Sequence, residues 1–312
     1  MPVPISAHRT LRAAGLLAVV LLGSAAGAAS APAATVGGLR SDPVVTVSDS
    51  FFGRSGRLRY RILRSDADPA TEVEPLIQAF GEAALERPGI LSVYDSSSGE
   101  PFHFVSLVPF AEKQNGRVGV YRVGRWPAEV RRPRSDAYRA PEGFIEVTEA
   151  TKELHVSTHF TFGQFLTKDQ HEVWPKMLLL DERLVDKLEL LISELRLAGI
   201  RAEGLGVLSG FRSPQYNNRG AGGGRARDSR HTYGDAADVY VDVNGDGRMD
   251  DLNRDRKSDI RDAIWLSKLV EKVEQKYPEL VGGLGVYRAT GVHGPFVHVD
   301  ARGERARWGF PR

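Results

Sequence analysis

Two histidines and one aspartate in the C-terminal half of the chain have the residue types and spacing of a metal site. Six residues separate His231 from Asp238, and His298 lies further along in the stretch Phe-Val-His-Val-Asp. Two imidazoles and one carboxylate are a ligand set of catalytic zinc, in which the fourth position stays open for water. Either histidine alone would read as a hydrogen-bonded structural residue, but the set predicts that His231, Asp238 and His298 bind Zn²⁺.

Two β-strands must bring these three side chains together. Residues 238–243 alternate between polar side chains and valines, and residues 296–300 also show a two-residue alternation. A period of two places alternate side chains on one face of a strand. Neighbouring strands would therefore aim Asp238 and His298 at one point, and the loop before the first strand would supply His231.

Three motifs follow one another in this half of the chain. They are Ser209-Gly210-Phe211-Arg212-Ser213-Pro214 with Asn217, then Ser229-Arg230-His231-Thr232-Tyr233-Gly234-Asp235-Ala236-Ala237-Asp238, and Phe296-Val297-His298-Val299-Asp300 followed by Arg307-Trp308. In this order they resemble the zinc D-Ala-D-Ala carboxypeptidase family, which includes murein endopeptidases and acts on peptidoglycan. The resemblance covers residues 157–308 and implies a zinc metallopeptidase that hydrolyses an amide bond in peptidoglycan stem peptides or cross-links. Arg212 would stabilise an oxyanion or hold a substrate carboxylate, unless it is an ordinary surface arginine.

The residue that transfers protons is where the chain departs from the pattern of that family. Many members carry an acidic residue three positions before the last zinc histidine, and others have a His-x-His arrangement. Here Pro295 and Phe296 occupy those positions, which leaves His293 and Asp300 as candidates. Asp300 lies about 7 Å along the strand from the last zinc histidine. It would either act through a bridging water or orient that imidazole by a hydrogen bond, and we favour the second role.

A second metal-like pattern directly follows the first strand. It places oxygen-bearing side chains at positions 1, 3, 5 and 9, a glycine at position 6 and a backbone carbonyl at position 7, as in EF-hand or dockerin-type calcium loops. The residues are Asp242, Asn244, Asp246, Arg248 (through its carbonyl) and Asp250, with Asn253 at position 12. Asn253 replaces the usual bidentate acid, which weakens affinity or alters the geometry. Bound calcium would be structural; the alternative is an Asx-rich turn before a helix at 258–275.

The expected fold class is α+β, with a C-terminal peptidase domain at 151–312. This domain should hold a small antiparallel sheet flanked by helices. The strongest helix runs from Asp181 to Ala198, with an N-cap aspartate and a stripe of four leucines. His155 and His159 would share a face only on a helix, and the β-branched residue types around them favour extended structure instead.

A β-rich accessory domain is expected at 41–130, before the peptidase domain. Short alternating or apolar runs predict its strands, and one interruption with helical spacing predicts a helix. The strand runs are 44–47, 57–63, 102–107 and 117–123, and the helix is expected at 72–85. Two prolines and several arginines at 131–150 predict a linker between the two domains.

Residues 1–34 read as a secretory signal peptide. Basic residues precede an apolar run at 13–22, and a tract of small residues with Ala-x-Ala cleavage options follows. The apolar run is shorter than the roughly 20 residues that a membrane span needs, so an uncleaved anchor is the weaker interpretation. We expect a periplasmic or secreted protein that has no membrane association once the signal is removed.

Composition narrows the class of partner. The chain has no cysteine, which excludes a disulfide framework, a thiolate metal site and a lipoprotein anchor. Its 42 basic and 40 acidic residues nearly balance, and nothing indicates a nucleic-acid partner. The expected partners are peptidoglycan stem peptides. Two other functions stay open: a non-catalytic peptidoglycan-binding protein with structural zinc and calcium, and a peptidase of ordinary proteins. The sequence does not distinguish carboxypeptidase from endopeptidase action.

Overall fold

The computed structural model describes residues 60–63, 77, 88–94, 101–220 and 226–310. The expected signal peptide, the expected strand at 44–47 and nearly all of the helix expected at 72–85 lie outside these residues. The described chain is a mixed α+β structure, as expected. None of its described helices is both long and apolar enough to cross a membrane.

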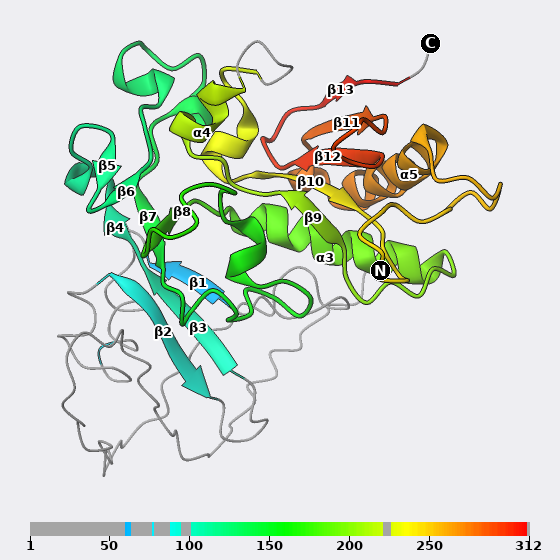
Figure 1. Ribbon diagram of the computed structural model, residues 1–312, viewed down its shortest axis with the longest axis horizontal. Helices are drawn as coiled ribbons and strands as arrows, with labels where there is room; N and C mark the ends of the chain where they lie inside the picture. Colours follow the sequence, from blue (N-terminus) through cyan, green and yellow to red (C-terminus); the bar gives the residue numbers. More distant parts are fainter. Residues whose placement is uncertain (1–59, 64–76, 78–87, 95–100, 221–225, 311–312) are drawn as a thin grey trace, which may run out of the picture.

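A five-stranded sheet carries two of the predicted metal ligands, Asp238 and His298 (Figure 1). Its strands are, in spatial order, β13 (Ala306–Trp308), β11 (Gly283–Tyr287), β12 (Phe296–Asp300), β10 (Ala236–Tyr240) and β9 (Gly206–Ser209). Neighbouring strands are antiparallel except β13, which runs parallel to β11. Asp238 lies directly opposite His298 in the register of β10 and β12. The prediction that two alternating strands lie side by side is therefore confirmed.

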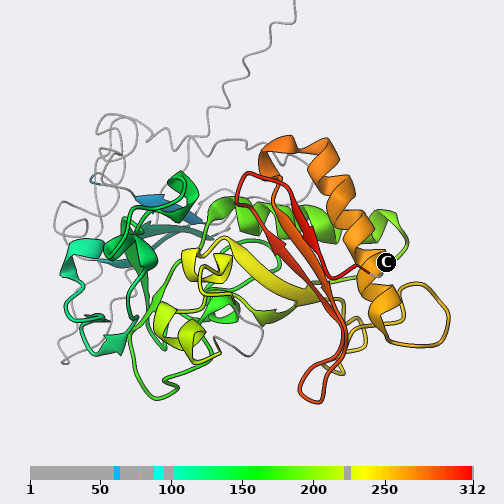
Figure 2. The same cartoon turned by 90° about the horizontal axis from the view of Figure 1, so that it is seen from above.

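Two long helices pack together beside this sheet (Figures 1 and 2). Helix α3 (Glu182–Leu197) follows the N-cap residue Asp181, and α5 (Ile260–Lys276) packs on β11, on β12 and against α3. The leucine stripe predicted for the first helix is at most 1% exposed and consists of Leu184, Leu188, Leu191 and Leu195. A shorter helix, α4 (Pro214–Arg219), follows β9. Two of the predicted ligands, Asp238 and His298, lie on strands β10 and β12, and α5 packs on β12.

A buried ionic cluster joins the two long helices to the end of β12. Lys187 on α3 is 1% exposed, and its Nζ donates to Glu274 Oε1 on α5 and to the carbonyl oxygen of Asp300, at 2.7 Å in both cases. Arg307 on β13 pairs with Glu274 as well. Burial lowers the pKa of Lys187, and the charge of Glu274 opposes this shift. Because a buried charge requires such partners, the cluster fixes the strand end that carries Asp300.

Three smaller sheets form the rest of the described chain. Their strands, in spatial order, are β1 (Tyr60–Leu63), β3 (Pro101–Ser106) and β2 (Gly89–Tyr94); β4 (Val108–Pro109), β7 (Gly143–Val147) and β8 (Lys176–Leu178); and β5 (Arg117–Val118) with β6 (Tyr121–Arg122). The run at 117–123 is thus a short hairpin and not one strand. The 3₁₀ helices are η2 (Phe110–Glu112), η3 (Pro127–Glu129), η4 (Asp136–Tyr138), η5 (Phe162–Phe165), η6 (Arg230–Tyr233) and η7 (Pro278–Leu280).

The segment 131–150, expected to be a linker, is part of the folded core. It contains β7, which pairs with β4 on one side and with β8 on the other. Buried side chains from Ile90 to Val299 form one continuous hydrophobic core. Trp126, just before the segment, donates through Nε1 to the carbonyl oxygen of Thr232 at 2.7 Å. The expected boundaries at 130 and 150 therefore do not separate two cores, because strand pairing and apolar contacts run across both.

Candidate metal centre

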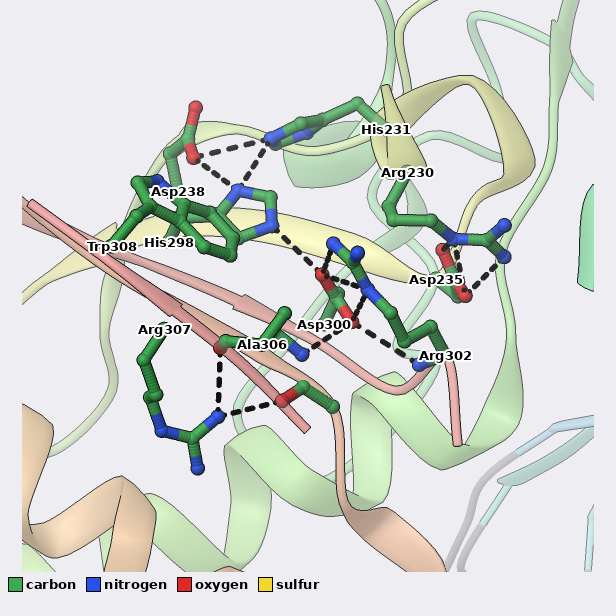
Figure 3. A network of polar contacts seen from close by, with 12 residues as sticks. Arg230, His231, Asp235, Asp238, His298, Asp300, Arg302, Ala306, Arg307 and Trp308 are labelled. Carbon is green, nitrogen blue, oxygen red and sulfur yellow. Dashed lines mark hydrogen bonds and ion pairs between the residues drawn. The ribbon is translucent and has the colours of Figure 1, made fainter. Parts of the chain in front are cut away.

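The three predicted ligands converge on one point (Figure 3). His231 Nε2 lies 3.1 Å from Asp238 Oδ1 and 3.1 Å from His298 Nδ1, and the latter two atoms are 3.0 Å apart. Ligand atoms about 2.0–2.1 Å from a tetrahedral ion are separated by roughly 3.3 Å, so a small outward shift admits one ion. In the part of the chain that the structure describes, this is the one group of three such side chains with ligand atoms within 4.8 Å of one another.

The other ring nitrogen of His231, Nδ1, forms a hydrogen bond within the protein. His231 lies in η6, and its Nδ1 donates to the carbonyl oxygen of Gly210 at 2.7 Å. The loop then turns sharply at Gly234, whose φ is +78°, to enter β10. A Cβ there would also meet the backbone carbonyl carbon of Leu179 at 2.4 Å, so glycine is required. This turn fixes the offset between the histidine and Asp238, and the Gly210 bond leaves Nε2 of His231 with a free lone pair.

His298 is oriented in the same way by a buried carboxylate. Its Nε2 donates to Asp300 Oδ2 at 3.1 Å, which leaves Nδ1 unprotonated toward the other two ligands. Asp300 is fully buried and also accepts from Gly283 N at 2.7 Å and from Arg302 Nη2 at 2.5 Å. Burial alone would raise the pKa of Asp300, but the bonds from His298 and Arg302 outweigh it and hold that pKa well below its usual range. Two imidazole lone pairs therefore face each other and Asp238, an arrangement that a cation stabilises.

Besides the two histidines, Asp238 contacts Arg212. Arg212 Nη2 donates to Asp238 Oδ2, and its Nε donates to Ser209 Oγ at 2.7 Å. Burial would raise the pKa of Asp238, but His231 and His298 together lower it well below the usual value. Arg212 is therefore not a free surface arginine: its side chain is 14% exposed and lies beside the centre.

An open cavity of about 860 Å³ lies over the centre and is lined by all three ligands. His293 lines it from the loop between β11 and β12, with Nδ1 donating to the carbonyl oxygen of Gly294 at 2.8 Å. Its Nε2 is thereby left as a proton acceptor. Asp300 does not line the cavity; it bonds His298 directly, with no bridging water, on the side away from the other ligands. The structure thus places only one of the two proton-transfer candidates where a substrate can reach it.

An aromatic wall, which the sequence did not reveal, closes one side of the cavity. Tyr287 stacks on Phe296 with ring centroids 4.6 Å apart, and Trp308 Nε1 donates to Tyr287 Oη at 2.8 Å. The Trp308 ring also lies 5.1 Å from the His298 ring. A Cβ on Gly285 would meet Trp308 Nε1 at 2.2 Å, so only glycine at this position lets the indole lie against the metal ligand. The Arg307-Trp308 pair of the third motif was the one signal of this wall.

In the predicted calcium loop, aspartate side chains accept hydrogen bonds from the backbone of the loop. Asp242 Oδ1 and Oδ2 accept from the backbone N–H groups of Asp246 at 3.0 Å and Gly247 at 2.8 Å, and Asp250 Oδ2 accepts from Val243 N at 2.7 Å. No three carboxylates of this loop have oxygens within 4.8 Å of one another. The Asx-type bonds match the turn considered as the alternative, and calcium binding stays a prediction.

The acidic loop is also longer than expected, because it is repeated. Residues 242–250 and 251–259 share the pattern Asp-x-Asn-x-Asp-x-[Arg/Lys]-x-Asp, and this nine-residue period was not predicted above. Asp255 N and Arg256 N donate to the two oxygens of Asp251 at 3.0 and 2.6 Å, as in the first copy. Position 12 of the second copy is Asp262, which is buried and accepts from Leu252 N at 2.9 Å. The acid that the first copy lacks is thus present in the second.

Comparisons with protein-family models, with curated proteins and with solved structures give no match. The likeness carried by the three motifs therefore rests on residues of this chain alone. What the geometry itself supplies is a buried pair of imidazoles and a carboxylate that can hold a metal ion at the floor of an open cavity.

Proposed function

We propose that the chain is a secreted or periplasmic zinc metallopeptidase that hydrolyses amide bonds in peptidoglycan stem peptides or cross-links. The observation that carries this proposal is the convergence of three ligand atoms beneath an open cavity, with the second ring nitrogen of both histidines already hydrogen-bonded to the protein. The donor set suits zinc, which prefers nitrogen and oxygen ligands of this kind. The three motifs support the substrate class.

His231, Asp238 and His298 would hold the ion. Zinc supplies Lewis-acid activation of water and of the carbonyl of the cleaved amide. Every other contribution comes from side chains around the cavity. Asp300 would keep His298 in the tautomer whose Nδ1 can bind the ion, and hydrogen bonds from Arg302 and a backbone N–H favour its ionised form.

Arg212 and His293 are the residues that we assign to the substrate. Arg212 lines the cavity beside Asp238, where its guanidinium would stabilise negative charge on the former carbonyl oxygen or hold a substrate carboxylate. His293 would accept a proton at Nε2 from attacking water and return it to the leaving amine. The aromatic wall gives the substrate an apolar surface that excludes water on one side.

Mass spectrometry of muropeptides tests this proposal. Peptidoglycan fragments are incubated with the mature protein, with and without a zinc chelator. Chelator-sensitive loss of a terminal D-Ala indicates carboxypeptidase action, and conversion of cross-linked dimers to monomers indicates endopeptidase action. Unchanged masses with zinc bound at one ion per chain would reject catalysis and favour a wall-binding protein, the alternative that Pro295 and Phe296 keep open.

A further inference from the structure

A small basic pocket continues the cavity of the metal centre. It has a volume of about 250 Å³ and shares Arg134, Tyr138 and Asp228 with the larger cavity. Its other lining residues are Pro127, Ala128, Arg131, Arg132, Pro133 and Tyr233. Most of these come from the segment once expected to be a linker or from its edge. The substrate groove is therefore built partly from a segment that the three motifs do not include.

Two tyrosine hydroxyls in this pocket lack partners. Tyr138 is 4% exposed, and the Oη atoms of Tyr138 and Tyr233 are buried with no hydrogen-bond partner. The Tyr138 ring is held in place by the Arg134 guanidinium at 3.7 Å and the Arg230 guanidinium at 4.7 Å from its centroid. A buried hydroxyl without a hydrogen-bond partner destabilises the folded protein. A ligand with acceptor oxygens would remove this destabilisation.

The charges around the pocket favour an anion. Arg131 is occupied by Asp228, with Nη2 2.7 Å from Oδ2, and Arg230 is occupied by Asp235. No acidic residue in the described ranges lies within ion-pair distance of Arg132 or Arg134, both of which are exposed. Guanidinium groups that carry no protein partner bind carboxylates through paired N–H donors. Two guanidiniums without an acidic partner therefore line the same small pocket as the two tyrosines whose hydroxyls are unpaired.

We infer that this pocket binds a carboxylate of the substrate that is distant from the cleaved amide. Arg134 would be its main donor, and Tyr138 Oη would add a hydrogen bond. This inference rests on the proposed function and specifies it: the preferred substrates are anionic peptides with a free carboxylate besides the one at or near the cleaved bond. Amidation of that carboxylate would remove the preference.

The test uses two synthetic cross-linked stem peptides that end in D-Ala-D-Ala. They differ only in the γ-linked glutamate, which carries a free α-carboxylate in one and a carboxamide in the other. Binding of N-methylated, uncleavable versions is measured by calorimetry on the zinc-loaded mature protein, and cleavage of the normal versions by mass spectrometry. The wild type should bind and cleave the carboxylate peptide about tenfold better, a difference of about 1.4 kcal/mol, because a charged acceptor strengthens the hydrogen bonds from Arg134.

Two variants and one control locate the effect. Arg134→Gln should abolish the preference, and Tyr138→Phe should reduce it, while the carboxamide peptide is affected little by either. Arg139→Gln removes a positive charge from the same segment at a residue that lines neither cavity, and it should keep the preference.

The outcomes separate the two proposals. Equal binding and cleavage of both peptides by the wild type would overturn the carboxylate pocket while leaving the peptidase intact. Selective binding that is lost in Arg134→Gln, without cleavage of either peptide, would support the pocket and reject the peptidase. A preference that survives Arg134→Gln, or peptides that do not bind, would also overturn the inference.

Discussion

The chain contains two motifs that resemble metal sites, and their ligand atoms are arranged differently in the structure. His231, Asp238 and His298 come from three separate elements, yet their ligand atoms lie 3.0–3.1 Å apart. The acidic loops at 242–259 are contiguous, yet their carboxylate oxygens accept from the N–H groups of their own backbone. The difference lies in the surroundings. At the centre, one ring nitrogen of each histidine donates to a protein oxygen, so the lone pair of the other nitrogen faces the other ligands. In the loops, the carboxylate oxygens accept hydrogen bonds from backbone N–H groups.

The largest expected effect comes from removing a ligand at the centre. His231→Ala should lose stoichiometric zinc and nearly all hydrolysis, because a catalytic zinc site has three protein ligands and only two would remain. Zinc content by mass spectrometry, together with muropeptide cleavage, measures both. His159→Ala is the matched control, because His159 pairs with Glu189 and does not line the cavity. The His159→Ala variant should retain the ion. One zinc per chain in His231→Ala would show that the ligand set is wrong.

A smaller effect is expected from the carboxylate behind the centre. Asp300→Asn removes the anion that holds His298 in one tautomer, and such partners typically contribute 10- to 100-fold to metal affinity. Competition with a chromogenic zinc chelator measures the affinity. Circular dichroism checks that the buried substitution leaves the fold intact. Unchanged zinc affinity in a folded variant would mean that Asp300 stabilises the sheet and does not contribute to metal binding.

Calcium should produce a still smaller change, confined to the loops. If each nine-residue copy binds one Ca²⁺, a hundredfold excess over Kd stabilises the protein by about 2.7 kcal/mol per site and raises Tm by roughly 5–10 °C per site. Asp242→Asn and Asp251→Asn should each reduce the shift, because each changes the first ligand of one copy. Differential scanning fluorimetry of chelator-treated protein provides the measurement. A Tm that calcium leaves unchanged would identify the loops as hydrogen-bonded turns only.

The smallest expected effect is a difference in pH dependence between the two copies. Partial burial and the charges of Asp242 and Asp246 raise the pKa of Asp250, at position 9 of the first copy. The folded state then favours the protonated form, so this contribution to stability is present at low pH and is lost as pH rises through the raised pKa. In the second copy, hydrogen bonds from Arg261 lower the pKa of Asp259, which gives the opposite sign.

The measurement is calcium-free thermal unfolding between about pH 3 and pH 6, around the usual pKa of aspartate. Asp250→Asn should improve the relative stability of the protein as pH rises through this range, and Asp259→Asn should reduce it. The same sign for both variants would show that the two copies do not differ electrostatically.

The sequence predicted the parts of the site that depend on local period. Alternation placed Asp238 and His298 on facing strands, and a leucine stripe predicted α3 with its N-cap. The Asp300 role was half predicted: the strand period gave about 7 Å between backbone positions, whereas the side chains approach to a direct bond of 3.1 Å. Side-chain reach, which the period does not describe, decided between the two roles.

The rest depends on pairing between distant segments, which leaves little local signal. Strand β7 is five residues long and follows a stretch of exposed arginines at 131–139, so 131–150 resembled a linker. Arg134 and Tyr138 consequently seemed remote from the site, although both line its cavity. The repeat at 251–259 was missed for another reason. Its glycine positions hold Arg254 and Arg256, which nevertheless adopt φ values of 64° and 68°.

The most direct test of the proposed function is a zinc titration of hydrolysis. Metal-free mature protein is supplied with increasing zinc, and cleavage of cross-linked muropeptides is followed by mass spectrometry at each step. We predict that cleavage rises linearly and stops rising at one zinc per chain, and that His231→Ala shows no rise. Full cleavage without zinc, or no cleavage with one zinc bound, would contradict the proposal that the His231, Asp238 and His298 centre is the catalytic site.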